Sequence, residues 1–197
     1  MKAKSTFGSS EFSAPRIAPL NAVLRTSTAA RRPLRRTDIA TADGIYQSLA
    51  ATLFARAAAI PQAVVRAAVT LCGAGSAGIS ILEQPADGPA RFRWTVVAGR
   101  LSKSVDFSTP ADFSTGGVCA EREEPVRFAF PERRFTYLQG LGVAFVEMLE
   151  VPLHVDGRSL GTLWTAAHTV GRRFGEDETE TLTRLSAIAG TSYTRAR

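Results

Sequence analysis

Hydrophobic residues recur with two different periods along the chain, and these periods separate its predicted helices from its predicted strands. A period near 3.6 predicts helices over residues 43–60, 61–72 and 177–195. Pro61 divides the first two, because proline disfavours a helical conformation in the residue before it and suits the first turn of a helix. We expect Asp43 to cap the first of these helices.

An alternation of apolar and polar residues predicts the strands, which are expected over 78–83, 92–98, 126–130, 148–155 and 159–168. In the fourth strand, the face with Glu150 and His154 should be wetter than the face with Leu149 and Val151. The Asp156-Gly157 pair is a strong hairpin signal. Because hairpins join the strands, we expect an antiparallel sheet with the helices on one face, which is an α+β architecture.

The segment from about 100 to 146 is longer than an ordinary connection, and much of it has no clear period. We expect only a short strand at 126–130 and a short helix at 134–141 within it. A disordered segment would be poor in aromatic residues, whereas this one contains Phe107, Phe113, Phe128, Phe130, Phe135, Tyr137 and Phe145. We therefore expect a folded lid over the second face of the sheet.

The formal net charge of +6 is concentrated in the first 36 residues. They hold eight Lys or Arg residues and one acidic residue, whereas residues 37–197 carry a net charge of −1. We interpret residues 1–36 as a basic, disordered leader and residues 37–197 as one domain. The leader could contact nucleic acid or a membrane, act as a transit peptide, or be a solvated tail or linker. Outside it, no strong signal for nucleic acid or a membrane is present.

Composition excludes several classes of protein. No apolar run reaches the roughly 18 residues of a membrane span, and two Cys and two His residues do not make a disulfide scaffold or a usual zinc site. Residues 73–78 (GAGSAG) match the dinucleotide fingerprint by letter, but a predicted helix precedes them and a strand follows. A pyrophosphate would then face the negative end of a helix, so we interpret them as a tight turn. The sequence identifies neither a cofactor nor a set of metal ligands.

Several blocks of residues 43–195 resemble GAF domains. The most specific is a strand, Asp-Gly, strand unit that ends in GTLW and is followed by RRFGEDE and a helix. The whole set is similar to the N-terminal sensory GAF domains of bacterial sensor histidine kinases. The blocks are LCGAGSAGISILE (71–83), FRWTVVAG (92–99), FSTGGVCAEREEPVRF (113–128), PERRFTYL (131–138), EMLEVPLHVDGRSLGTLWTAAH (147–168) and RRFGEDETETLTRLSAIA (172–189).

The resemblance implies both a fold and a class of function. The fold has a six-stranded antiparallel sheet, with helices on one face and a loop-covered ligand pocket on the other. The function is that of a non-catalytic, cytoplasmic sensory domain in a two-component system, which binds a small molecule and forms a homodimer through its first and last helices. We expect the output module, a histidine kinase or another protein, to act as a separate partner or to have been removed by truncation.

One position departs from that subfamily. A cysteine often stands where this chain has Gly116, and here the cysteine comes three residues later, at Cys119. Cys119 could be a redox-sensing thiol, a covalent attachment point or a buried apolar residue. The first alternative function is therefore a Cys119-dependent redox sensor or reductase. A nucleophile–base pair of Cys119 with His168, oriented by Asp112, has less support, because such residues often occur together by chance.

The ligand is expected among the aromatic residues of the middle segment and of the neighbouring strands, since small-molecule sites are mostly apolar with a few placed polar groups. Trp164 and His168 share a strand face, so they could supply an apolar wall and a polar contact. Arg134 could meet an anionic ligand. The candidate ligand-binding residues are Trp94, Phe113, Cys119, Phe128, Phe130, Arg134, Tyr137, Trp164 and His168. No catalytic residue is assigned.

Overall fold

One antiparallel sheet of six strands forms the centre of the domain, in the order β3-β2-β1-β6-β5-β4. This computed structural model describes residues 17–25 and 36–195. The α+β fold with an antiparallel sheet, expected from the sequence, is confirmed. The strands are β1 (Ser76–Glu83), β2 (Arg91–Gly99), β3 (Ser108–Pro110), β4 (Val126–Ala129), β5 (Glu147–Val155) and β6 (Arg158–Ala167).

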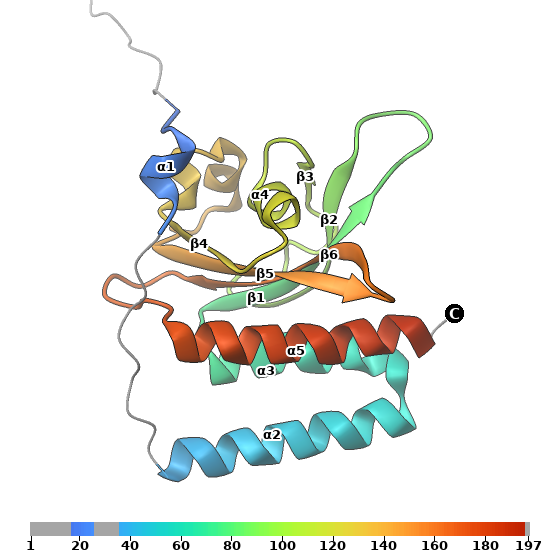
Figure 1. The fold of residues 1–197 in the computed structure, drawn as a ribbon. Coiled ribbons are helices and arrows are strands. Elements are labelled where there is room, and N and C mark those ends of the chain that lie inside the picture. Colours follow the sequence, from blue (N-terminus) through green and yellow to red (C-terminus); the bar gives the residue numbers. More distant parts are fainter. Residues whose placement is uncertain (1–16, 26–35, 196–197) are drawn as a thin grey trace, which may run out of the picture.

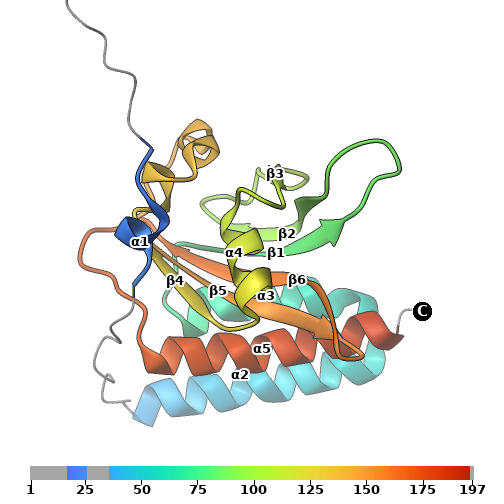
Figure 2. The ribbon, with the colours of Figure 1, turned by 45° about the horizontal axis from the view of Figure 1, so that its top comes forward.

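Three long helices lie on one face of the sheet, as Figure 1 shows. The helices α3 (Ile60–Leu71) and α5 (Glu176–Arg195) lie against the strands, and α2 (Arg36–Ala55) forms an outer layer over them (Figures 1 and 2). A short 3-10 helix, η1 (Ala57–Ala59), joins α2 to α3. Among the described residues, none of the helices combines the length and the apolar character that crossing a lipid bilayer requires.

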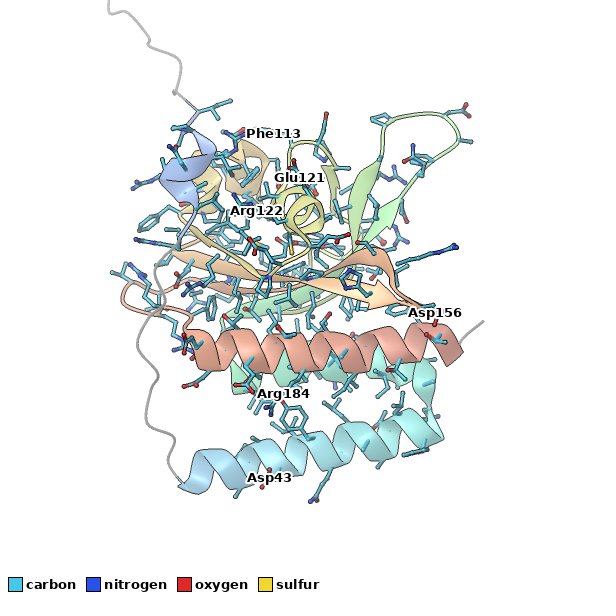
Figure 3. All side chains as sticks on the ribbon, in the orientation of Figure 1. Asp43, Phe113, Glu121, Arg122, Asp156 and Arg184 are labelled. Atoms are coloured by element: carbon cyan, nitrogen blue, oxygen red, sulfur yellow. The ribbon has the colours of Figure 1, made fainter. Side chains whose placement is uncertain are left out.

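Shorter elements cover the opposite face of the sheet (Figures 1 and 2). They are α1 (Leu20–Val23), α4 (Thr115–Arg122) and the 3-10 helices η2 (Pro131–Arg133) and η3 (Thr136–Leu141). The middle segment therefore folds over the second face of the sheet, as its aromatic content predicts. In Figure 3, Phe113 lies on this side, whereas Arg184 of α5 and Asp43 of α2 lie on the other.

The sheet separates two hydrophobic clusters. The helix-side cluster packs β1, β5 and β6 against α3 and α5, and its fully buried members include Ile79, Leu149, Leu163 and Leu185. The second cluster, on the other face, is richer in aromatic residues than the first. Its buried members are Val23, Trp94, Val97, Leu101, Cys119, Val126, Phe128, Phe135, Leu138, Phe145, Met148, Trp164 and Ala166.

Two predicted turns have the backbone that their residues favour. Asp156 and Gly157 both have positive φ angles, +50° and +73°, as a two-residue hairpin between right-twisted strands requires. Gly73 has φ +54° directly after α3, and β1 begins at Ser76. The GAGSAG stretch is therefore a helix-to-strand turn and the start of a strand, so the predicted tight turn is confirmed.

The boundaries differ from the sequence prediction in the first helix and within residues 100–125. The first helix runs from Arg36 to Ala55, so Asp43 lies inside it rather than at its start, and Ile60 belongs to α3 rather than to the end of this helix. Packing outweighs the poor helix propensity of Gly44, because Leu49 of this helix is 3% exposed. Within residues 100–125, which lack a clear period, the chain forms β3 and α4. Both are too short to show a period in the sequence.

Part of the predicted leader is also folded. Residues Leu20–Val23 form α1, and Leu24 pairs with Phe128 of β4 in an antiparallel bridge. Val23 is 1% exposed and belongs to the second cluster. The expectation of a disordered leader therefore does not hold for residues 17–25. Residues 1–16 and 26–35, which carry most of its basic residues, lie outside the described residues.

Candidate functional site: an aromatic cluster around a buried carboxyl group

Two tryptophans form the floor of the second cluster. The rings of Trp94 on β2 and Trp164 on β6 lie 4.5 Å apart. Trp164 lies over Gly78 of β1, where a methyl group would overlap the indole ring. Its indole nitrogen donates a 3.0 Å hydrogen bond to Ser80 Oγ. The glycine and the serine thus fix the position of Trp164, which is 0% exposed.

Further aromatic rings continue from these tryptophans into the covering segment. Phe107 lies 5.1 Å from Trp94 and 6.1 Å from Tyr137, measured between ring centroids. Phe135 contacts both Phe113, at 5.5 Å, and Phe128, at 5.7 Å. Offset and edge-on ring pairs of this kind add to the stabilisation from apolar burial. The cluster therefore joins the sheet to its cover through ring contacts.

A carboxyl group is buried in this apolar region. Glu150 lies on β5, opposite Trp164 in the strand register, and is 1% exposed. Its Oε1 accepts a 2.5 Å hydrogen bond from Thr162 Oγ1, whereas its Oε2 is buried without a hydrogen-bond partner. Burial raises the pKa of Glu150 to about 7, although the hydroxyl groups of Thr162 and Thr115 oppose the shift. Glu150 can therefore change its protonation state near neutral pH.

The expectation that this face of β5 is the wetter one is wrong at Glu150. His154 near the end of the strand is exposed, but Glu150 and Met148 are buried under the covering segment. The strand pattern predicts that Glu150 points away from the Leu149 face. It does not predict what covers that second face, since the cover comes from a segment without a clear period.

Tyr137 of η3 brings a second unpartnered oxygen to the region. Its hydroxyl group is buried without a hydrogen-bond partner. Burial, followed by the nearby charge of Glu150, raises the pKa of this hydroxyl above its usual range. The backbone and hydroxyl group of Thr115 and the hydroxyl group of Thr109 lie close to the phenol and partly oppose this rise in its pKa. We call Glu150, Tyr137, Thr109, Thr115 and Thr162 the buried polar group.

The helix α4 forms a cover over the buried polar group. Ser114 caps its start, because Ser114 Oγ accepts a 3.0 Å hydrogen bond from the Gly117 backbone nitrogen. A methyl group at Gly116 would lie 3.2 Å from both Glu150 Oε1 and the Phe92 ring. Gly116 therefore lets the helix backbone approach the carboxyl group closely. Ser114 before a helical turn is a capping signal that a more detailed sequence reading would find.

The Cys119 thiol lies in the second cluster but is poorly suited to react. Cys119 is 0% exposed, and its Sγ donates a 3.5 Å hydrogen bond to the Glu124 carbonyl oxygen. Burial, and then the negative charge of Glu150, raise the pKa of Cys119 well above its usual range. Because the thiolate is the reactive form, these contacts argue against the redox alternative. Cys72 is equally buried, and burial raises the pKa of its thiol to about 12.

His168 lies at the end of the sheet and has local partners. Its Nδ1 donates a 2.7 Å hydrogen bond to the Ala144 carbonyl oxygen, and its Nε2 pairs with Ser76 Oγ at 2.8 Å. Burial lowers its pKa, only partly offset by the bond to Ala144. Both ring nitrogens are therefore engaged elsewhere, and His168 and Cys119 do not form the nucleophile–base pair considered above.

The structure brings together six of the nine predicted ligand-binding residues in the second cluster: Trp94, Phe113, Cys119, Phe128, Tyr137 and Trp164. Arg134 lies at its edge, with its guanidinium 5.4 Å from the Phe113 ring centre and bonded to the Ala18 carbonyl oxygen. The His168 ring contacts Phe145 of the cluster, at 5.4 Å between ring centroids. Phe130 is not a member of the cluster, and its ring carries the Arg133 guanidinium at 4.5 Å. Sequence reasoning missed Glu150, Thr109, Thr115 and Thr162.

No group of three or more metal-ligating side chains occurs within residues 17–25 and 36–195. The acidic group of the candidate site is the carboxyl of Glu150, which is surrounded by hydroxyl groups and aromatic rings. The arrangement can bind a polar group in an apolar environment and can exchange one proton with it. It offers no activated nucleophile, since the cluster's one thiol is held in its protonated form.

Comparison with known proteins assigns this geometry to a family. Residues 57–193 match the GAF domain family. No curated protein is similar enough in sequence to count as a relative. Among solved structures, the GAF domain of a phosphoenolpyruvate-protein phosphotransferase from Coxiella burnetii has a TM-score of 0.67 at 20% identity. That alignment covers 81% of this chain and 94% of the other.

Two further structures show the range of proteins with this fold. The second GAF domain of DevS from Mycobacterium smegmatis has a TM-score of 0.57 at 22% identity, over 71% of this chain and 94% of that domain. The free methionine-R-sulfoxide reductase from Neisseria meningitidis, solved with its substrate, has a TM-score of 0.64 at 14% identity, over 86% and 99% of the two chains. At these identities the likeness concerns the fold. With the family match over more than half of its length, this chain belongs to the GAF domain family.

Proposed function

We propose that this chain is a non-catalytic sensory domain that binds a small molecule in the second cluster and reports its presence to a signalling partner. The observation that carries this proposal is the buried polar group: two buried oxygens without partners lie among aromatic rings, beneath a short helix. Buried polar atoms without partners are rare in folded proteins, and a site for a ligand is one reason for keeping them. GAF domains of DevS and of a phosphoenolpyruvate-protein phosphotransferase share the fold.

The proposal requires the cover over the sheet to move, and the cover has the features of a segment that can open. Its helix α4 has eight residues, among them Gly116 and Gly117, which have low helix propensity. The 3-10 helices that complete the cover are short and have weaker hydrogen-bond geometry than an α-helix. The helix side of the sheet, in contrast, is covered by helices of 12 and 20 residues.

The test is a thermal-shift screen of metabolites, nucleotides and tetrapyrroles, together with mass spectrometry of small molecules that co-purify with the protein. We expect at least one compound to raise the melting temperature. Gly116→Ala should require at least a tenfold higher concentration of that compound for the same shift in melting temperature, because the added methyl group lies against Glu150 and Phe92. Gly140→Ala is the matched control, because nothing lies within 4 Å of that position.

A screen in which no compound shifts the melting temperature, with none co-purifying, would contradict the proposal. Equal responses of the two glycine variants would place the binding site elsewhere.

The proposed output is a homodimer formed through α2 and α5, acting on a histidine kinase or another output module. Of these helices, α2 forms the layer furthest from the cover (Figure 1). The helix α5 lies in the layer beneath it and has an exposed side at Thr183, Ala187 and Thr191. Sedimentation analysis tests this part independently. We expect a dimer at micromolar concentration, which Ala51→Glu on the exposed side of α2 should weaken. A monomer at all concentrations would contradict it.

A further inference from the structure

The chemistry of the two unpartnered oxygens indicates which ligand the site would take. Glu150 Oε2 and the Tyr137 hydroxyl oxygen are both buried without a hydrogen-bond partner. A carboxylate oxygen only accepts hydrogen bonds. Glu150 also lacks a cationic neighbour: burial and the hydroxyls of Thr162 and Thr115 determine its state, and no described Arg or Lys contributes. In its ionised form Glu150 therefore lacks a hydrogen-bond donor as a partner, and a cationic donor fits a carboxylate best.

The other groups that face Glu150 are neutral. Cys119 of α4 and Tyr137 of η3 interact with its charge, and both keep their protons because burial raises the pKa of each. Phe92 and Gly116 pack against the same region from β2 and α4. A carboxylate enclosed in this way is costly to bury unless it is protonated or paired with a cation. A ligand's positive charge would supply that pairing.

The aromatic rings around the carboxyl group favour a cation as well. Trp164 is the strand partner of Glu150, and the Trp94 ring lies 4.5 Å from the Trp164 ring. Tyr137 continues the ring contacts through Phe107. Cations bind favourably over the faces of such rings, and tryptophan is the strongest of them. The rings also provide an apolar surface for the remainder of a ligand.

We infer that the second cluster binds a small molecule through a protonated amine or amidine, which pairs with Glu150 and hydrogen-bonds the Tyr137 hydroxyl, while an apolar part of the ligand lies among the tryptophans. This inference rests on the proposed function, because it names the ligand class of the same site. Binding of the cation ionises Glu150, and the proton that it loses goes to solvent. Ligand binding is therefore coupled to proton release near neutral pH.

The experiment uses two pairs of probes that differ in charge but little in shape. Benzylamine and benzamidine carry a cationic nitrogen at pH 7, and benzyl alcohol and benzamide are their neutral counterparts. Isothermal titration of the full chain should show the cationic probes binding at least tenfold more tightly than the neutral ones. Titration in buffers of different ionisation enthalpy should show release of a fraction of a proton with the cationic probes only.

Variants assign the effect to Glu150. Glu150→Gln keeps the shape of the side chain and removes its charge, so it should weaken the cationic probes at least tenfold. Glu147→Gln is the control, because Glu147 is also buried on β5 but its Oε2 accepts a 2.8 Å hydrogen bond from the Phe174 nitrogen, away from the second cluster. If Glu150→Gln fails to fold, Tyr137→Phe removes the other oxygen alone and should weaken the cationic probes several-fold.

Each result distinguishes this inference from the proposed function. Neutral and cationic probes that bind equally, or cationic binding unchanged in Glu150→Gln, would overturn the ligand class and leave the sensory role standing. If no probe binds, the cationic class is overturned, and the compound screen described above then decides whether the sensory role fails with it.

Discussion

The two faces of the sheet are covered by elements of different length and are packed with side chains of different chemistry. On the helix side, aliphatic residues such as Leu149, Leu163 and Leu185 pack against long helices. On the other side, aromatic rings enclose a carboxyl group and a phenol, each with one oxygen that lacks a hydrogen-bond partner, beneath a helix of eight residues. The first face therefore has the composition of an ordinary hydrophobic core, whereas the second, under the proposed function, keeps a binding site at some cost in stability.

The largest expected effect comes from the helix side. Leu163→Ala should lower the free energy of unfolding by about 3 kcal/mol, because Leu163 is 0% exposed and its neighbours cannot fill the cavity. Urea denaturation measures this change. Val170→Ala, at a position that is 86% exposed, should alter stability by less than about 0.5 kcal/mol. A loss below about 1 kcal/mol for Leu163→Ala would show that the helix side is not the rigid core.

The buried carboxyl should make stability depend on pH. Burial raises the pKa of Glu150 from 4.5 to about 7, so the folded state keeps a proton that the unfolded chain has lost. The stabilisation from this retained proton is fully present below about pH 4.5 and is lost as the pH rises to about 7. The free energy of unfolding should fall by about 3 kcal/mol across this range. The free energy of unfolding of Glu150→Gln should not show this fall with pH. Parallel stability curves for wild type and variant would contradict the buried, proton-holding carboxyl.

A smaller effect tests whether Trp164 is a fixed wall of the second cluster. Gly78→Ala should destabilise the domain by about 2 kcal/mol, because the new methyl group overlaps the indole ring and lies 2.8 Å from the Val96 carbonyl oxygen. Gly44→Ala, with nothing within 4 Å, should instead be neutral or raise stability by up to about 1 kcal/mol. Chemical denaturation monitored by tryptophan fluorescence measures the stability of both variants. An unaffected Gly78→Ala variant would mean that Trp164 can move freely.

The reaction rates of the two cysteine thiols allow a direct comparison of the faces, because each face holds one cysteine and both are 0% exposed. Cys119 should react with iodoacetamide at least tenfold faster than Cys72, since it becomes accessible when the cover opens locally. The Cys72 thiol should react only through larger unfolding of the helix side. Peptide mass spectrometry of the wild-type protein measures both rates in one sample. Faster labelling of Cys72 would reverse the assignment of the mobile face.

The fold could be predicted from the sequence to a large extent. Alternation located β5 and β6, and the Asp156-Gly157 pair located their hairpin, because both signals depend only on neighbouring residues. The start of α2 was placed too late, since packing of residues such as Leu49 overrode the weak propensity at Gly44. The folded segment 17–25 was missed because its main contact, the bridge from Leu24 to Phe128, spans a long sequence separation.

The candidate site could be predicted only in its apolar part. The aromatic content of the middle segment correctly located most of the second cluster. Glu150 was placed on a wetter face, because its burial depends on α4 and η3, which come from outside its own strand. Thr162 and Thr115 acquire their roles only through contact with Glu150. Such tertiary contacts leave no pattern in any one stretch of sequence.

Native-state hydrogen exchange tests the division between the two faces most directly. We expect amides of α4 and η3 to exchange through local openings whose free energies lie several-fold below that of global unfolding, while amides of α3, β1 and β6 exchange only through global unfolding. Exchange in α4 and η3 as slow as that in α3 would contradict the account, because the second face would then be as closed as the helix-side core.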